Sequence, residues 1–302
     1  MLIDPHCHLH DREFLSEEQA REMLARAGAN GVRKIVCIGT SYEDSMVACQ
    51  FASEHPGVYW TYGIHPESAR KGAGLNFSSS GLEFLSTSYA GAPREPSLRD
   101  EPLGPVRNIR VKNSNHFMIQ KEMIQSPSWD SANAPIGIGE VGLDYHYEGY
   151  DREAQIRLFE EMLQLASDND LPVSFHVREA FSDFFPVVAN FPGVRGVVHS
   201  FTDSKKVLRR ILEETEFYVG VNGLATYSTL PLPPLERILL ETDAPFLTPI
   251  PFRGIINEPG YVRCVAEWLG AKLALDWETI EHETTKNAEK LFRFDNAVIP
   301  TE

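Results

Sequence analysis

The sequence has 302 residues, of which 42% are hydrophobic and 24% charged, with a formal net charge of −15 at pH 7. This composition is that of a soluble globular protein with a sizeable core, which excludes a disordered or fibrous chain. The acidic balance disfavours wide, non-specific contact with a nucleic-acid backbone, because such contact needs basic surface. Chains of this length commonly fold as one α/β barrel, so we expect a single domain over residues 1–302.

Short β-rich runs alternate with amphipathic helical stretches, which is the pattern of a parallel sheet with crossover helices. The predicted strands are residues 1–6, 34–39, 58–64, 135–141, 172–176, 196–199, 217–221 and 238–242. The predicted helices are residues 17–27, 42–54, 151–167, 178–189, 204–214, 258–269 and 277–292. Ser41 and Ser204 precede two of these helices and are predicted N-caps. Eight strands in this order predict a closed (β/α)8 barrel of the TIM type.

Two segments depart from the alternation. Residues from about 68 to 134 are rich in Ser, Asn, Gly and Pro and have weak periodicity, so we expect a long insertion between the third and fourth strands. Residues 225–234 (ATYSTLPLPP) are too few and too rich in proline for an ordinary helix. The sequence therefore predicts a shortened crossover before the eighth strand.

The four cysteines have neither a CxxC pair nor the spacing of a disulfide framework. We therefore expect reduced thiols in a cytoplasmic protein. Cys7 stands between two histidines in a strand, and because successive side chains of a strand point to opposite faces, it should be buried and not a ligand. The sequence shows no signal peptide and no apolar run of membrane-spanning length, so we expect no contact with a membrane.

Polar side chains end the apolar runs of the predicted strands. His6 and His8 are two residues apart, so both project to one face of the strand and could hold a metal ion from the same side. The other strand-end residues are His65, Glu140, His176, His199 and Asp243. Reactive groups of TIM-type barrels lie at these strand ends, which predicts one shared site. The remaining histidines lack this placement and are expected at the surface; they are His10, His55, His116, His146 and His282.

Imidazole and carboxylate groups are natural ligands of divalent metals, and a hydrolytic site keeps positions open for water. Six candidate ligands are more than one open site needs; they are His6, His8, Glu140, His176, His199 and Asp243. The number favours two metal ions bridged by Glu140, because a carboxylate has two oxygens that can reach two ions. Two metals about 3.5 to 4 Å apart can hold a hydroxide and stabilise the attacking and leaving oxygens. Hydrolysis of a phosphate ester suits this arrangement.

Six motifs occur in order on the predicted strands: DPHCHL, YGIHP, IGEVGLDY, FHVREA, HSFT and LLETDAPFLTP. Together they resemble the signature set of the TatD family, a branch of the metal-dependent hydrolases that is similar to the amidohydrolases and has a TIM-barrel fold. The resemblance implies that the six candidate ligands form the metal site and that the protein is a deoxyribonuclease trimming DNA ends. Asp243 would be both a ligand and the proton acceptor for the attacking water, with Glu140 as the second catalytic carboxylate.

The resemblance also implies substrate contacts. His65 and Arg178 would face the phosphate, since a guanidinium binds phosphate oxygens in a bidentate way. Tyr145 would stack on a base at the mouth of the site. Two positions depart from the family pattern: His10 stands where an Asp is common after HCHL, and Asp203 where a Gly is usual after HSFT.

Several alternatives stay open. The two metals could be Zn²⁺, Mn²⁺ or Mg²⁺. The partner is expected to be DNA or a small phosphodiester, and the protein itself a monomer or a small homo-oligomer. An ester or amide hydrolase, such as a D-aminoacyl-tRNA deacylase, would use the same metals and the same water. A non-catalytic binding protein on an inherited barrel would show eroded ligands, and in this sequence none is eroded.

Overall fold

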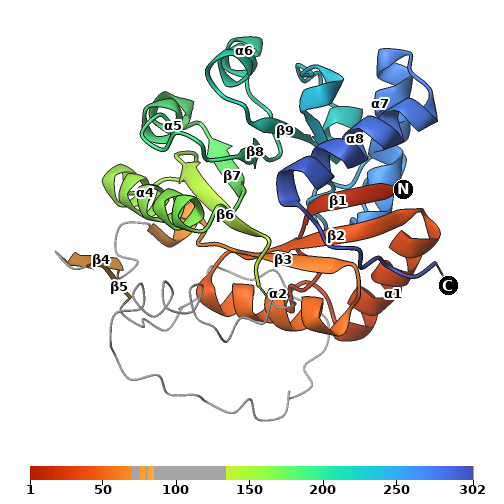
Figure 1. Cartoon of the computed structure of the whole chain (residues 1–302), viewed down its shortest axis with the longest axis horizontal. Coiled ribbons are helices and arrows are strands. Elements are labelled where there is room, and N and C mark those ends of the chain that lie inside the picture. The colour runs from red at the N-terminus through yellow and green to blue at the C-terminus, as the bar shows by residue number, and fades with distance from the viewer. Residues whose placement is uncertain (70–74, 79–80, 85–133, 302) are drawn as a thin grey trace.

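The computed structural model describes residues 1–69, 75–78, 81–84 and 134–301. Its main sheet has eight parallel strands that neighbour each other in chain order, with helices packed on the outside (Figure 1). The strands are β1 (Leu2–Cys7), β2 (Val32–Ile38), β3 (Val58–Tyr62), β6 (Gly137–Asp144), β7 (Val173–Arg178), β8 (Gly196–Val198), β9 (Tyr218–Val221) and β10 (Ile238–Leu240). All eight strands were predicted from the sequence, with bounds that differ by a few residues.

Backbone hydrogen bonds join the first strand to the segment after the last one. Asp243 N donates to His6 O at 2.9 Å, and His8 N donates to Ala244 O at 2.6 Å. The buried Asp4 carboxylate adds a third link, because its Oδ1 accepts a hydrogen bond from Thr242 N at 3.0 Å. These bonds bring the two edges of the sheet together, and the predicted TIM-type barrel is confirmed.

The helices follow the strands as in a βα barrel. They are α1 (Glu17–Ala29), α2 (Tyr42–Glu54), α4 (Arg152–Asp168), α5 (Phe181–Val188), α6 (Lys205–Glu214), α7 (Val262–Leu273) and α8 (Trp277–Phe292). The Oγ atoms of Ser41 and Ser204 accept hydrogen bonds from Asp44 N and Val207 N, so both predicted N-caps are confirmed. In the part of the chain that the structure describes, no helix is both long and apolar enough to span a membrane.

The two irregular segments have different outcomes. Between β9 and β10 the chain has only two short 3₁₀ turns, η2 (Gly223–Thr226) and η3 (Leu235–Arg237), so the shortened crossover is confirmed. Most of the predicted insertion, residues about 68–134, lies outside the described residues. Two of its described segments, β4 (Leu75–Ser78) and β5 (Gly81–Phe84), pair in antiparallel fashion.

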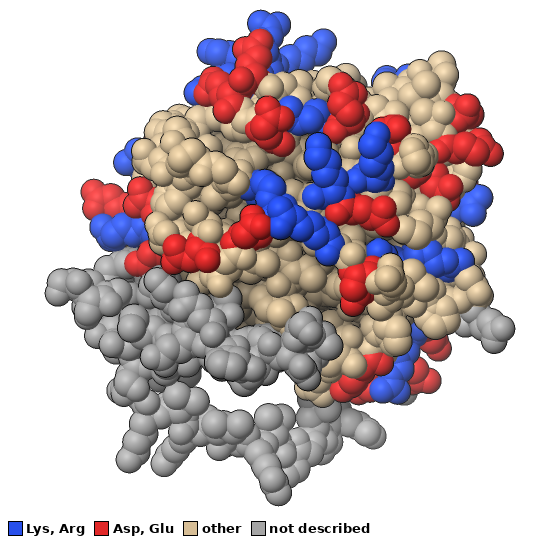
Figure 2. Space-filling view, viewed as in Figure 1, with Lys and Arg blue, Asp and Glu red and all other residues tan. Residues whose placement is uncertain are grey.

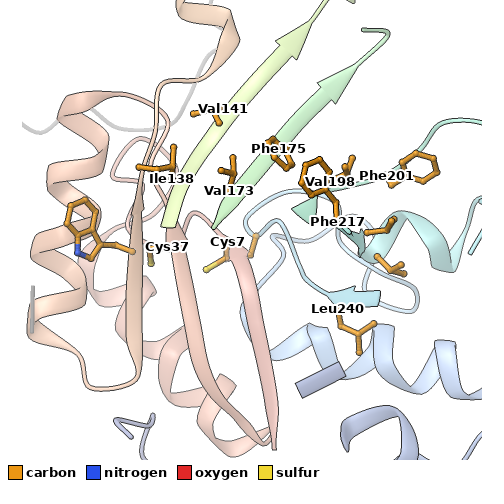
Figure 3. Close-up of a cluster of buried hydrophobic side chains, with 14 of the residues drawn as sticks. Cys7, Cys37, Ile138, Val141, Val173, Phe175, Val198, Phe201, Phe217 and Leu240 are labelled. Atoms are coloured by element: carbon orange, nitrogen blue, oxygen red, sulfur yellow. The ribbon is translucent and has the colours of Figure 1, made fainter. Parts of the chain in front are cut away.

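Among the described residues the buried hydrophobic side chains form one large and two small clusters, and neighbouring residues of a strand can belong to different clusters. Val198 belongs to the large layer between the sheet and the surrounding helices, which Figure 3 shows together with Phe175 and Phe217. Its neighbour Val197 belongs to a smaller cluster, which also contains Phe292 at the end of α8. Successive side chains of a strand face opposite sides, so this smaller cluster lies on the face of the sheet opposite the large layer. This packing fixes the strand ends that carry the polar residues.

Candidate metal centre

The polar side chains that end the strands meet at the C-terminal end of the barrel. The residues that the structure brings together there are His6, His8, His65, Glu140, His176, His199 and Asp243. They come from both halves of the chain, and the parallel strands place their ends at one face of the barrel. All six predicted ligands are in this group. Their role in metal binding stays a prediction.

The two histidines of β1 face the same two carboxylates. His6 Nε2 lies 3.5 Å from Asp243 Oδ1 and 3.8 Å from Glu140 Oε2. His8 Nε2 lies at the same distances from the same two oxygens. Two imidazole nitrogens and two carboxylate oxygens thus surround a single point, as the spacing of the His-x-His pair predicts.

The other nitrogen of each ring, Nδ1, lies next to an oxygen atom of another strand. His8 Nδ1 is 3.0 Å from the carbonyl oxygen of Ile38, and His6 Nδ1 is 3.0 Å from Ser174 Oγ. A carbonyl only accepts hydrogen bonds, so His8 Nδ1 must carry its proton. In the neutral ring this leaves the lone pair on Nε2, which is the atom that faces the carboxylates.

Glu140 lies between the two halves of the centre. Its Oε2 faces the β1 histidines, whereas its Oε1 is 2.8 Å from His176 Nδ1, 2.8 Å from His199 Nε2 and 3.9 Å from His65 Nε2. Burial alone would raise the pKa of Glu140, but His199, His176 and His65 outweigh burial and hold it well below its ordinary value. An ionised carboxylate whose two oxygens face different sets of histidines has the geometry of a bridging ligand.

Asp144 is a part of the centre that sequence reasoning missed. Its Oδ2 lies 2.9 Å from His176 Nε2, on the side of the ring opposite Glu140. Burial lowers the pKa of His176, yet its bonds to Asp144 and Glu140 outweigh burial and raise the pKa above the ordinary value. Asp144 follows Glu140 by four residues in the GLDY motif and ends the same strand, and this strand-end position was the signal that could have found it.

Glu241 is a second carboxylate that was missed. It is fully buried next to the ring of His199, with Oε1 3.7 Å from His199 Nδ1. Burial disfavours the charged imidazole, but Glu140 and Glu241 on its two sides raise the pKa of His199 well above its ordinary value. The signal in the sequence was the ETD triplet, in which Glu241 precedes the predicted ligand Asp243 by two residues.

One structural observation, which is independent of the sequence motif, indicates that these residues suit a divalent metal. His6 Nε2 is buried and has no hydrogen-bond partner among the described residues. Burial and the neighbouring His199, whose ring stacks on that of His6 at 3.9 Å, hold the pKa of His6 well below its ordinary value. A buried, neutral imidazole with a free nitrogen lone pair, surrounded by carboxylate oxygens, is the donor set that Zn²⁺ or Mn²⁺ takes.

Among the described residues, three groups of ligand atoms are close enough to hold an ion. Within each group the atoms lie within 4.8 Å of one another; the groups are His6, His8 and Glu140; His6, His199 and Asp243; and His65, Glu140 and His176. The third group places His65 next to the ligands, whereas the sequence predicted only a substrate contact. Burial and the neighbouring His176 lower the pKa of His65 to about 3, so its ring is neutral and able to bind either a metal or a phosphate.

One prediction about the remaining histidines was wrong. His10 was expected at the surface, but it is fully buried and its Nε2 is 3.0 Å from Asp44 Oδ1 on α2. His10 is itself part of the β1–α1 connection, and the first turn of α2 supplies the carboxylate that it contacts. His146 and His282 are exposed and His55 is partly exposed, as expected. His116 lies outside the described residues.

The predicted substrate contacts at Arg178 and Tyr145 lie beside the centre with partners of their own. Arg178 ends β7, and its Nη1 donates to the hydroxyl of Tyr147 at 3.2 Å. The ring of Tyr145 stacks on that of Tyr150 at 4.7 Å, and its hydroxyl donates to Asp183 at 2.8 Å. Contact of these residues with a substrate stays a prediction.

Several known proteins resemble this chain over nearly its whole length. The uncharacterised metal-dependent hydrolase YabD of Bacillus subtilis is 29% identical over 98% of this chain and 100% of its own. The 3'-5' ssDNA/RNA exonuclease TatD of Cronobacter sakazakii is 29% identical over 94% of this chain and 92% of its own. The crystal structure of YjjV, a TatD homologue from Escherichia coli, superposes with a TM-score of 0.73 at 24% identity, covers 97% of this chain and 98% of its own, and shows the same fold.

The sequence also matches a family as a whole. The match extends over residues 3–293, from the strand of the His-x-His pair to the end of α8, and the family is described as TatD related DNase. The chain therefore belongs to the TatD-related DNase family and is a metal-dependent hydrolase.

Proposed function

We propose that this protein hydrolyses phosphodiester bonds of DNA and removes nucleotides from strand ends, using two divalent metal ions. The observation that carries the proposal is the position of Glu140, whose Oε2 faces the β1 histidines while its Oε1 lies 2.8 Å from His176 and His199. A carboxylate between two sets of imidazoles suits a metal pair, and a metal pair suits phosphoryl transfer. The Cronobacter relative, described as an exonuclease of single-stranded DNA and RNA, supports this substrate class.

The side chains of the centre have distinct roles in this proposal. His6, His8, His176, His199, Glu140 and Asp243 would hold the metals, which when bound would supply an activated water and neutralise charge on the phosphate. Asp243 accepts the proton of the attacking water. Its Oδ1 points to both β1 histidines at 3.5 Å, and its backbone is fixed to His6 O.

Two further residues bind the phosphate. His65 is neutral, so it offers the phosphate a hydrogen bond without adding a charge next to the metals. Arg178 offers the phosphate a bidentate contact. The net charge of −15 fits such a local grip of the substrate. Figure 2 shows basic and acidic side chains interspersed over the viewed face, which is not the continuous basic surface that wide backbone contact would need.

The test is cleavage of end-labelled single- and double-stranded DNA with Mg²⁺, Mn²⁺ or Zn²⁺. Asp243→Asn and Glu140→Gln should lower the rate at least a hundredfold with an unchanged circular dichroism spectrum. Glu278→Gln, a change at an exposed residue of α8, is the matched control and should keep the parent rate. The proposal fails if the parent leaves every DNA uncut, or if the two variants cut as the parent does. Release of the amino acid from D-aminoacyl-tRNA would instead identify a deacylase.

A further inference from the structure

Two aromatic side chains are exposed beside the metal centre, and none of the roles above uses them. Phe14, in the β1–α1 connection, is 53% exposed, and Phe246, after β10, is 40% exposed. Their rings meet edge to face, with centroids 5.0 Å apart and planes at 82°. Large apolar side chains that are exposed together commonly mark a binding site.

The pair is directly connected to the candidate ligands. The Phe246 ring lies 6.2 Å from the ring of His8, and Phe246 N donates a hydrogen bond to Asp243 O at 2.9 Å. Phe246 therefore has a position fixed by a ligand residue. A phosphate held at the metal centre would have its own nucleoside next to this pair.

The chemistry of the pair suits an unpaired base. Every nucleobase has a π face, and proteins that bind single strands stack bases on aromatic side chains. In a duplex the base faces are covered by their neighbours, so only an unstacked base can use such a surface. The predicted stacking residue Tyr145 has a ring already stacked on Tyr150, whereas Phe14 and Phe246 are open to solvent.

We propose that Phe14 and Phe246 form a platform on which the base at the cleaved end stacks, so that the protein prefers strand ends that carry a base to abasic ends. This inference rests on the proposed function, because the platform would bind the base of the nucleotide that the centre cleaves. The platform would be the part of the site that distinguishes a nucleotide from a phosphodiester that has no base.

The test compares oligonucleotides that end in an ordinary base with the same strands ending in an abasic residue, with labels at either end. The parent should cleave the ordinary end roughly tenfold or more faster in kcat/KM, the range that base–aromatic stacking supplies. Phe14→Leu/Phe246→Leu keeps apolar side chains but removes both rings, so the ordinary end should fall to the abasic rate, which itself should not change. Phe14→Tyr/Phe246→Tyr keeps the rings and should restore the preference.

A binding measurement tests base stacking on the platform independently of hydrolysis. The fluorescence of 2-aminopurine at the strand end should be quenched by the parent and not by the Leu variant. Phe252→Leu is the matched control, because this ring lies on the same loop but is already stacked on Tyr261 at 4.3 Å. It should quench as the parent does.

The outcomes distinguish the two proposals. Quenching that depends on the rings without any cleavage would overturn the proposed function and leave the platform standing. Cleavage with equal rates on ordinary and abasic ends would overturn the platform and leave the function standing. A Leu variant that keeps the quenching but changes the oligomeric state in size-exclusion chromatography would show an interface between copies, and would also overturn the platform.

Discussion

The carboxylate of Glu241 lies beside the ring of His199, with Oε1 3.7 Å from Nδ1, while Nε2 of the same ring faces Glu140 at 2.8 Å. Glu241 Oε1 also accepts a hydrogen bond from Ser200 N at 2.6 Å, so its position is fixed by the backbone. A carboxylate behind a ligating imidazole sets its orientation and raises its basicity. Glu241 does not itself face Glu140, but it sets the orientation of the His199 ring toward the centre.

The first prediction concerns this support. Glu241→Gln should weaken metal binding about 10- to 100-fold, because the neutral amide no longer holds the imidazole in place. Isothermal titration calorimetry with Mn²⁺ and Zn²⁺ measures the effect. Gly220→Ala should have the same effect, since a Cβ at Gly220 would lie 2.5 Å from both carboxylate oxygens of Glu241. Glu236→Gln, at an exposed residue of η3, is the control. Parent affinity in Glu241→Gln would contradict the prediction.

The second prediction concerns the number of metals. Equilibrium dialysis should give two metal equivalents for the parent and one for His8→Ala or His176→Ala, because these residues lie on different oxygens of Glu140. Glu140→Ala should weaken the binding of both metal ions. His282→Ala, whose side chain is 74% exposed, is a matched control that should retain two. A single equivalent in the parent would rule out the bridged pair.

The third prediction concerns the buried pair of His10 and Asp44. Burial disfavours the charge on each residue, but their mutual hydrogen bond raises the pKa of His10 to about 10 and lowers that of Asp44 to about 2. Asp44→Asn should destabilise the fold by roughly 2 to 4 kcal/mol, because it removes the partner of a buried charge. Urea unfolding in EDTA measures this loss.

A double-mutant cycle decides whether the loss comes from the pair. His10→Gln/Asp44→Asn should cost less than the sum of the two single changes, since no unpaired charge is left inside. Additive costs would show that the two residues act independently.

The fourth prediction concerns Glu161 on α4. Burial raises its pKa to about 7, with a smaller opposing effect of Arg157, and its Oε2 has no hydrogen-bond partner in the described part of the chain. In the unfolded chain the carboxyl loses its proton near pH 4.5. The folded protein therefore binds more protons between about pH 4.5 and 7, so this group makes the protein less stable as the pH rises through that range.

Glu161→Gln should remove this effect. The variant should be more stable than the parent by roughly 1 kcal/mol at pH 8, a value reduced for the partial exposure of the side chain. The gain should shrink as the pH is lowered towards 4.5. Urea unfolding of both proteins from pH 5 to 8 at constant ionic strength measures it, and a gain that is constant over this range would argue against the assignment.

The strands and most helices could be predicted because each βα unit carries its own pattern in the sequence. The observed bounds differ from the predicted ones where local signals compete. The helix expected from residue 178 begins at Phe181, because Arg178 still pairs with Asp144 in the sheet. The positions of the strand-end histidines follow from the parallel topology, which made the six candidate ligands visible before the structure.

The residues that were missed depend on contacts between distant segments. Nothing near His10 in the sequence indicates burial, since its partner Asp44 comes from α2, the second helix after it. Asp144 and Glu241 resemble ordinary polar residues at strand ends until the rings of His176 and His199 are seen next to them. Phe14 and Phe246 were not singled out by any sequence pattern, and the structure exposes both rings.

The backbone bond from Asp243 N to His6 O has a consequence for biosynthesis. The two residues lie almost at opposite ends of the barrel sequence, so a nascent chain presents the β1 histidines long before Asp243 leaves the ribosome. Contacts between such distant segments form late in folding, because a long loop must close first. An unfinished chain therefore lacks the proposed proton acceptor, and the complete centre arises only when the last strand docks against the first.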